Sequence, residues 1–257
     1  MSGIMPVVFV GHGSPMNAVE ENQFSAGWRQ MAAALPRPGA ILAVSAHWYA
    51  GGTLLCADPR PKTVYDMYGF PPELYQATYP APGSPALAAD AAALLGEGAQ
   101  AVSGWGLDHG VWSVLRRMYP AADIPVVPMS VDAGASAGRW FELGRSLRPL
   151  RRRGVLILAS GNVVHNLGLL DWNRAGGFDW ADEFDAWARE NILAGRREAL
   201  CRWQEAGPCA QKAVPTPDHY APLLYAAGAA EEDDRPTVWN DARTLGSLSM
   251  TSYIFAK

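Results

Sequence analysis

The sequence of 257 residues contains only three cysteines, Cys56, Cys201 and Cys209, and no CxxC pair. An odd number of cysteines argues against a disulfide framework and favours a reducing compartment, so we expect a cytoplasmic protein. The segment up to Val10 lacks a basic stretch followed by an apolar one, so no signal peptide is predicted. No segment reaches the ~18 consecutive apolar residues of a membrane span, and we expect no membrane partner.

Several motifs of nucleotide-binding and hydrolytic enzymes are also missing. The sequence has no phosphate loop, no GxGxxG after a strand, no GxSxG elbow and no HExxH pair. A formal net charge of −4 argues against a nucleic-acid partner. The basic cluster of Arg148 and Arg151 to Arg153 fits the last turn of a helix capped by Gly154, and the acidic run 231–234 is expected to be a solvated loop.

Short β-branched runs alternate with helical patterns along the chain. Strands are expected at 7–10, 41–45, 125–131 and 155–160, and helices at 22–35, 84–95, 111–119, 138–152, 181–205 and 217–229. This alternation predicts an α/β fold, a single domain over 1–257 with a central, mostly parallel sheet flanked by helices. The alternating segment 247–255 is expected to form a late edge strand.

The segment 58–82 is rich in proline and tyrosine, so it cannot be a long helix or a central strand. Two interpretations are open. The segment is either a structural loop that covers the edge of the sheet, or a wall for a planar aromatic ligand.

Histidines follow two of the apolar runs directly. His12 stands in a Gly-His-Gly-Ser turn after the run 7–10, and His47 follows the run 41–44. In open α/β sheets, ligands bind outside the carboxyl ends of the strands, so these two imidazoles are expected to meet in one crevice. Imidazole is a common ligand of zinc and of non-haem iron, and this pattern predicts a metal site.

The other three histidines, His109, His165 and His219, stand in similar loop-like settings. Taken alone, His109 and His219 could each simply cap a helix. Taken together, five histidines are more than one ion needs. A histidine that lies near a metal without binding it is a natural acid/base group, because its pKa is close to neutrality.

Six blocks spread over nearly the whole chain resemble one family. They are Gly11-His12-Gly13-Ser14-Pro15-Met16, Ser45-Ala46-His47-Trp48, Tyr79-Pro80-Ala81-Pro82-Gly83-Ser84-Pro85, Trp105-Gly106-Leu107-Asp108-His109-Gly110, Ser160-Gly161-Asn162-Val163-Val164-His165-Asn166-Leu167 and His219-Tyr220-Ala221-Pro222-Leu223-Leu224. The chain is similar to the 4,5-DOPA extradiol dioxygenases, a branch of the class III, LigB-like enzymes. The resemblance implies a LigB-like fold and the oxygen-dependent opening of a catechol ring, such as that of L-DOPA, beside one of its hydroxyls.

The resemblance also implies roles for the five histidines. His12, His47 and His219 match metal ligands, and His165 matches an acid/base group that can become a fourth ligand to zinc. His109 matches a histidine that contacts substrate or dioxygen and stabilises the charge that develops there, and the adjacent Asp108 is a candidate to orient it. Iron(II) is the ion implied for activity, although an all-imidazole site suits zinc(II) at least as well.

Two other functions stay open at this point. A zinc hydrolase would be active with zinc and without oxygen, and a non-catalytic metal-binding protein would show no turnover with any metal. The surplus of histidines favours the dioxygenase, because a binding site has no use for His109 and His165 as separate acid/base groups. The expected partners are a small catechol and O2, and the expected state is a monomer or a small homo-oligomer.

Overall fold

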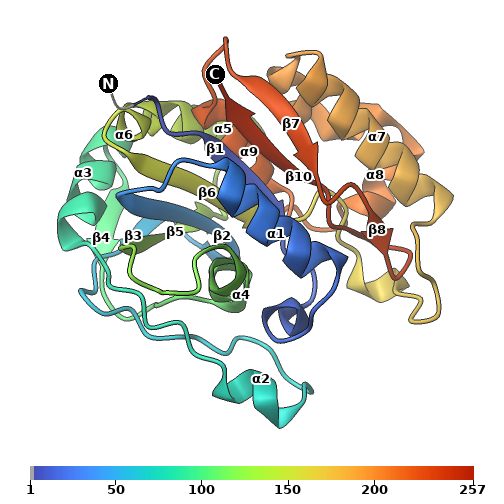
Figure 1. The fold of residues 1–257 in the computed structure, drawn as a ribbon. Helices are drawn as coiled ribbons and strands as arrows, with labels where there is room; N and C mark the ends of the chain where they lie inside the picture. Colours follow the sequence, from blue (N-terminus) through green and yellow to red (C-terminus); the bar gives the residue numbers. More distant parts are fainter. Residues whose placement is uncertain (1–2) are drawn as a thin grey trace.

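A computed structural model describes residues 3–257, and an eight-stranded mixed sheet forms its centre (Figure 1). The strand order is β4-β3-β5-β2-β6-β1-β10-β7. The central strands β5, β2, β6 and β1 are parallel to one another. β10 pairs antiparallel with β1, and β7 pairs antiparallel with β10. The strands are β1 (Val7–Gly11), β2 (Ala40–Ala50), β3 (Thr53–Cys56), β4 (Ala99–Val102), β5 (Val126–Asp132), β6 (Val155–Gly161), β7 (Arg235–Trp239) and β10 (Ser252–Ala256), with the small pair β8 (Arg243–Thr244) and β9 (Leu248–Ser249) apart from them.

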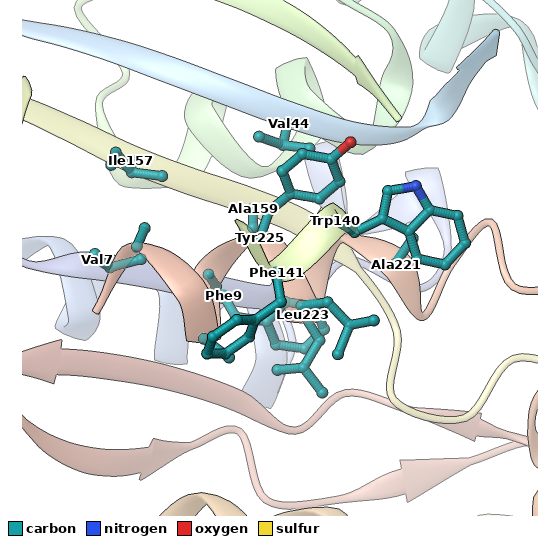
Figure 2. Packing of buried hydrophobic residues seen from close by; sticks show 14 of the residues in the cluster. Val7, Phe9, Val44, Trp140, Phe141, Ile157, Ala159, Ala221, Leu223 and Tyr225 are labelled. Carbon is teal, nitrogen blue, oxygen red and sulfur yellow. The ribbon is translucent and has the colours of Figure 1, made fainter. Parts of the chain in front are cut away.

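Helices cover both faces of the sheet. They are α1 (Gln23–Ala34), α2 (Pro72–Gln76), α3 (Pro85–Leu95), α4 (His109–Met118), α5 (Ala137–Ser146), α6 (Arg148–Arg151), α7 (Asp179–Leu193), α8 (Pro208–Ala213) and α9 (Ala221–Ala229), with 3-10 turns η1 (Pro15–Ala18), η2 (Leu167–Leu169) and η3 (Arg197–Ala206). Alternate residues of each central strand pack into two separate apolar clusters. In β1, Val7 and Phe9 face the cluster with α5 and α9 (Figure 2). Val8 and Val10 face the cluster with α1 and α4.

The expected α/β fold is confirmed, and several boundaries differ from the expectation. The helix expected over 138–152 is divided into α5 and α6, and the helix expected over 181–205 stops at Leu193. Gly195 has φ +73°, a conformation that ends a helix readily. Strands β3, β4 and β7 were not expected. No helix in residues 3–257 has the length and apolar composition needed to cross a membrane.

The expectation of an edge strand over 247–255 is wrong. β10 lies between β1 and β7, and its residues are almost all buried. The polar residues that suggested a solvated face are buried and hydrogen-bonded instead, as when the Ser252 hydroxyl accepts a hydrogen bond from the Gly11 amide at 3.1 Å. Alternation of polar and apolar residues therefore did not indicate exposure here.

The acidic run is likewise not fully solvated. The carboxylate of Asp234 is buried and accepts hydrogen bonds from the buried guanidinium of Arg151 at 2.6 and 3.1 Å. Arg151 also donates to the carbonyls of Met5 and Ala229, so most of its donors are used. Arg151 was expected to complement a helix dipole at the surface. Its guanidinium instead joins Met5, Ala229 and Asp234 in the interior.

The proline-rich segment contributes to the core on one face of the sheet. Leu74 and Tyr79 are buried in the cluster with α1 and α4, and the Tyr79 hydroxyl donates to the carbonyl of Tyr119 at 2.9 Å. The short helix α2 lies in this segment and projects at the bottom of Figure 1. The segment also carries Asp66, which takes part in the site described next.

Candidate metal centre

The five histidines lie together outside the carboxyl ends of the central strands. His12 directly follows β1, His165 follows β6, His109 is the first residue of α4 and His219 precedes α9. The ring centroid of His12 lies 4.9 Å from that of His47, 5.7 Å from that of His109 and 5.3 Å from that of His219. The convergence of His12 and His47 that the sequence predicts is therefore present in the structure.

A bulge in β2 places His47. β2 pairs with β5 in register up to Ser45 and Ser130, and the pairing resumes only at Tyr49 and Val131. The extra residues on β2 break the strict alternation of side chains, which is a common way to redirect a side chain beside a functional site. His47 lies within this insertion, and its ring is directed toward His12.

Two glycines allow the histidines to approach the backbone closely. A Cβ atom on Gly110 would lie 2.8 Å from Cδ2 of His47, and one on Gly161 would lie 2.2 Å from the carbonyl oxygen of His219. The Asn162 amide donates to that same carbonyl at 2.8 Å. The end of β6 and the start of α4 therefore pack against the histidines without side chains between them.

Hydrogen bonds determine which nitrogen of His12 carries the proton. The Ser160 hydroxyl donates its only hydrogen to the carbonyl of Gly110 at 2.5 Å. Nδ1 of His12 lies 2.9 Å from the same hydroxyl oxygen, so this nitrogen must be the donor. The lone pair of the neutral ring is therefore on Nε2, which is free to bind a cation.

Carboxylates fix the tautomers of two further rings. Nδ1 of His47 lies 3.1 Å from Oδ2 of Asp66, and Nδ1 of His219 makes a short hydrogen bond with Asp218. A carboxylate only accepts hydrogen bonds, so both histidines donate from Nδ1 and keep the Nε2 lone pair. These are the arrangements that orient histidine ligands in metal sites.

Two features of the histidine cluster suit it to binding a metal ion. Nε2 of His12 and Nε2 of His47 lie 3.0 Å apart, and two lone pairs at that distance repel unless a cation or proton lies between them. Nε2 of His219 is buried and has no hydrogen-bond partner in residues 3–257. A buried polar atom without a partner is costly, and a cation bound by the three rings would satisfy it.

His109 also lies beside this centre. Ligand atoms of His12, His47 and His109 all lie within 4.8 Å of one another, and those of His165, Asp218 and His219 form a second such group. Nδ1 of His109 and its backbone amide both donate to Oδ1 of Asp66, at 3.0 and 2.9 Å. His109 therefore keeps an Nε2 lone pair as well.

The expectation that Asp108 orients His109 is wrong. The buried carboxylate of Asp108 accepts hydrogen bonds from Ser45 at 2.7 Å and from Trp105 at 3.3 Å, and Asp66 orients His109 instead. Asp66 was not singled out from the sequence, because it is 43 residues from His109 and lies in a segment without regular pattern. Its position between two histidines depends on the tertiary fold.

His165 makes no hydrogen bond through its ring nitrogens to residues 3–257, and its ring stacks on that of His219. Burial and the neighbouring His219 lower the pKa of His165 to about 2, so its ring is neutral at pH 7. Burial lowers the pKa of His219 to about 4 against the opposing effect of Asp218, and burial lowers that of His12 well below its usual value. Burial also acts on His47, but Asp66 and Asp108 outweigh it and raise the pKa of that ring.

Comparison with known proteins gives the family. Residues 5–256 match the family described as the catalytic LigB subunit of aromatic ring-opening dioxygenase. The chain belongs to this family. LigB dioxygenases depend on a metal, which agrees with the buried group of His12, His47 and His109.

Individual relatives agree with this assignment. The chain is 42% identical to the 4,5-DOPA dioxygenase extradiol of Escherichia coli K12, over 96% of this chain and 93% of that protein. It is 36% identical to the protein of the same name from Beta vulgaris, over 98% and 97% of the two chains. A crystal structure of an uncharacterized protein from Escherichia coli K12 superposes with a TM-score of 0.85 at 39% identity, covering 97% of this chain and 99% of that one.

Proposed function

We propose that this member of the LigB family opens the ring of a catechol, such as L-DOPA, with O2 beside one of the two hydroxyls. The observation that carries the proposal is the set of three imidazoles with free Nε2 atoms, those of His12, His47 and His219, whose ring centroids lie 4.9, 5.3 and 5.0 Å apart, with two further histidines beside them. Relatives named 4,5-DOPA dioxygenase extradiol support the catechol as the substrate class.

His12, His47 and His219 are the proposed ligands of one iron(II) ion. Each ring donates from Nδ1 to a neighbour within the protein, to Ser160 or to a carboxylate, which leaves Nε2 for the ion. Held by these three residues, a ferrous ion would supply the electron transfer between a catechol and O2. Zinc would fit the same imidazoles but has no redox chemistry.

His165 and His109 are the proposed acid/base and charge-stabilising groups. The ring nitrogens of His165 make no hydrogen bond to residues 3–257, so the ring is free to accept the proton of a catechol hydroxyl and to return a proton as the catechol ring opens. Burial lowers the pKa of His165, and the negative charge of a catecholate beside it would raise that pKa again. His109 is anchored through Nδ1 on Asp66, which directs its other nitrogen toward the centre. Nε2 of the neutral ring carries a lone pair, so His109 would stabilise negative charge on the oxygen atoms after this nitrogen has taken up a proton from a catechol hydroxyl.

The test is reconstitution of the metal-free protein with iron(II) under anaerobic conditions, followed by L-DOPA and air. We expect oxygen uptake and a new visible absorption band, and neither signal when zinc replaces iron. Activity with zinc in the absence of oxygen would instead favour the hydrolase. A lack of turnover with any metal across a panel of catechols would favour a binding protein.

We also propose that the chain works as one catalytic domain in the cytoplasm, as a monomer or a small homo-oligomer. Two apolar clusters on opposite faces of one continuous sheet support the single domain. The three cysteines are free thiols, which suits a reducing compartment.

A further inference from the structure

One carboxylate lies between two of the histidine rings. Oδ2 of Asp66 is 3.1 Å from Nδ1 of His47, and Oδ1 is 3.0 Å from Nδ1 of His109. The two rings are themselves close, with centroids 3.9 Å apart. The side chain of Asp66 is only 18% exposed, so water competes little for its oxygens.

The backbone around Asp66 is held in place. The Val64 amide donates to the carbonyl of Leu107 at 2.7 Å, and the indole of Trp112 donates to the carbonyl of Val64 at 3.0 Å. The amide of His109 donates to the Asp66 carboxylate itself. Val64, two residues before Asp66, is thus fastened to residues on either side of His109, and the carboxylate has little freedom to leave the rings.

We propose that Asp66 is a positioning residue that sets the tautomers of His47 and His109 together through its two oxygens. A carboxylate can only accept hydrogen bonds, so both rings must carry their proton on Nδ1 and present Nε2 to the centre. The role of His47 as a metal ligand rests on the proposed function, whereas the shared acceptor is a feature of the geometry. The segment that carries Asp66 therefore organises the centre, in addition to covering the sheet.

Asp66 therefore links His47, a proposed metal ligand, to His109, the ring that is proposed to stabilise charge on the substrate oxygens. If Asp66 is removed, neither ring retains an acceptor at Nδ1, and the proton of each neutral ring can move to Nε2. A proton on Nε2 of His47 would prevent binding of the ion, and a proton on Nε2 of His109 would change which hydrogen bonds that ring offers.

The substitution Asp66→Asn separates the two effects. An amide of the same shape has one oxygen that accepts and one nitrogen that donates, so it can serve only one of the two rings as Asp66 does. Oδ1 accepts from both the backbone amide and Nδ1 of His109, so the amide oxygen is expected to take that position. The amide nitrogen then faces Nδ1 of His47, which in the metal-free protein must become an acceptor and move its proton to Nε2.

The experiment is ¹⁵N nuclear magnetic resonance of the histidine rings in the metal-free protein, combined with zinc affinity by chelator competition. For Asp66→Asn we expect the His47 proton on Nε2, the His109 proton still on Nδ1, and a zinc affinity lower by roughly 10- to 100-fold. The matched control is Asp58→Asn in the same segment, where the carboxylate accepts from the Gly104 amide at 2.8 Å and contacts no histidine. This control is expected to retain both tautomers and the zinc affinity.

Unchanged tautomers of both rings in Asp66→Asn would overturn the proposal, as would an equal change in Asp58→Asn. The substitution Asp66→Glu retains two accepting oxygens, and recovery of the Nδ1 tautomer of His47 there would support it. Neither measurement depends on ring opening. If the wild-type protein fails to consume oxygen with any catechol while Asp66→Asn still shifts the His47 proton, the proposed function fails and the role of Asp66 stands.

Discussion

The rings of His165 and His219 are stacked in parallel, with centroids 3.5 Å apart and planes 2° from each other. The stack places His165 beside a proposed ligand while its own ring nitrogens form no hydrogen bond within residues 3–257. His165→Ala is therefore expected to retain zinc, with affinity reduced by less than about tenfold. Its rate of ring opening is expected to fall by ~10²- to 10⁴-fold, because it lacks the acid/base group.

The comparison for this prediction is His12→Ala, which is expected to lose both metal and activity because His12 is a proposed ligand with a free Nε2. Metal content by chelator competition and single-turnover oxygen uptake would be measured on both variants. An equal loss of metal in the two would show that His165 acts as a ligand and not as a separate acid/base group.

A second prediction concerns Ser160, which accepts a hydrogen bond from His12 and donates one to Gly110. Ser160→Ala removes the acceptor that holds the proton of His12 on Nδ1, so zinc affinity is expected to fall by roughly 10- to 100-fold. It also leaves the buried Nδ1–H of His12 without its acceptor, at a cost of ~1–3 kcal/mol in the free energy of unfolding.

Ser113→Ala is a matched control for this substitution. The Ser113 hydroxyl is also buried but has no hydrogen-bond partner among residues 3–257, so its removal is expected to be neutral or slightly stabilising. Urea unfolding and zinc competition would be measured on both proteins. Similar losses of metal affinity in the two variants would contradict the role of Ser160.

The site illustrates which features can be predicted from sequence. His12 and His47 could be placed because each follows an apolar run that forms a parallel strand, and parallel strands end at the same edge. The bulge that directs His47 leaves no comparable signal, because it depends on how β2 pairs with β5. Asp66 could not be predicted either, since its contacts connect residues that are far apart in the chain.

The errors in the fold have the same origin. The alternation in β10 resembles a half-exposed strand, yet Tyr253 and Phe255 face one apolar cluster while Ile254 faces the other. The serine that precedes them is buried because the backbone of β1 donates to it. A local pattern gives the period of a strand, whereas its neighbours in the sheet decide whether a polar position meets water.

A third prediction concerns the dependence of stability on pH. Burial raises the pKa of Asp185 in the folded protein, although the carboxylate accepts hydrogen bonds from Ser249, Thr251 and Arg243. An acid whose folded pKa is raised stabilises the fold fully below its unfolded pKa of ~3.9, and this contribution is lost as pH rises through the folded value.

Asp185→Asn does not titrate, so it lacks this change. We expect the free energy of unfolding of the wild type, relative to that of Asp185→Asn, to decrease as pH rises from about 4 to 7. Urea unfolding of both proteins at several pH values would measure the difference. A difference that increases with pH would mean that Arg243 and the two hydroxyls outweigh burial and lower the pKa of Asp185.

A last prediction separates stability from metal binding at Gly110, the second residue of α4. Alanine there has a higher helix propensity, worth up to ~1 kcal/mol, but its Cβ would lie 2.8 Å from Cδ2 of His47 and 3.3 Å from Nδ1 of His12. The His47 ring must move to make room, so Gly110→Ala is expected to lower zinc affinity by at least ~10-fold.

Gly138→Ala tests the same change without the histidines. Gly138 is the second residue of α5, and a Cβ atom there meets nothing within 4 Å, so only the gain in helix propensity should remain. Thermal unfolding and chelator competition on the two variants would separate the effects. If Gly110→Ala binds zinc as tightly as Gly138→Ala does, His47 tolerates displacement, and close packing of α4 against its ring is not what holds the ligand in position.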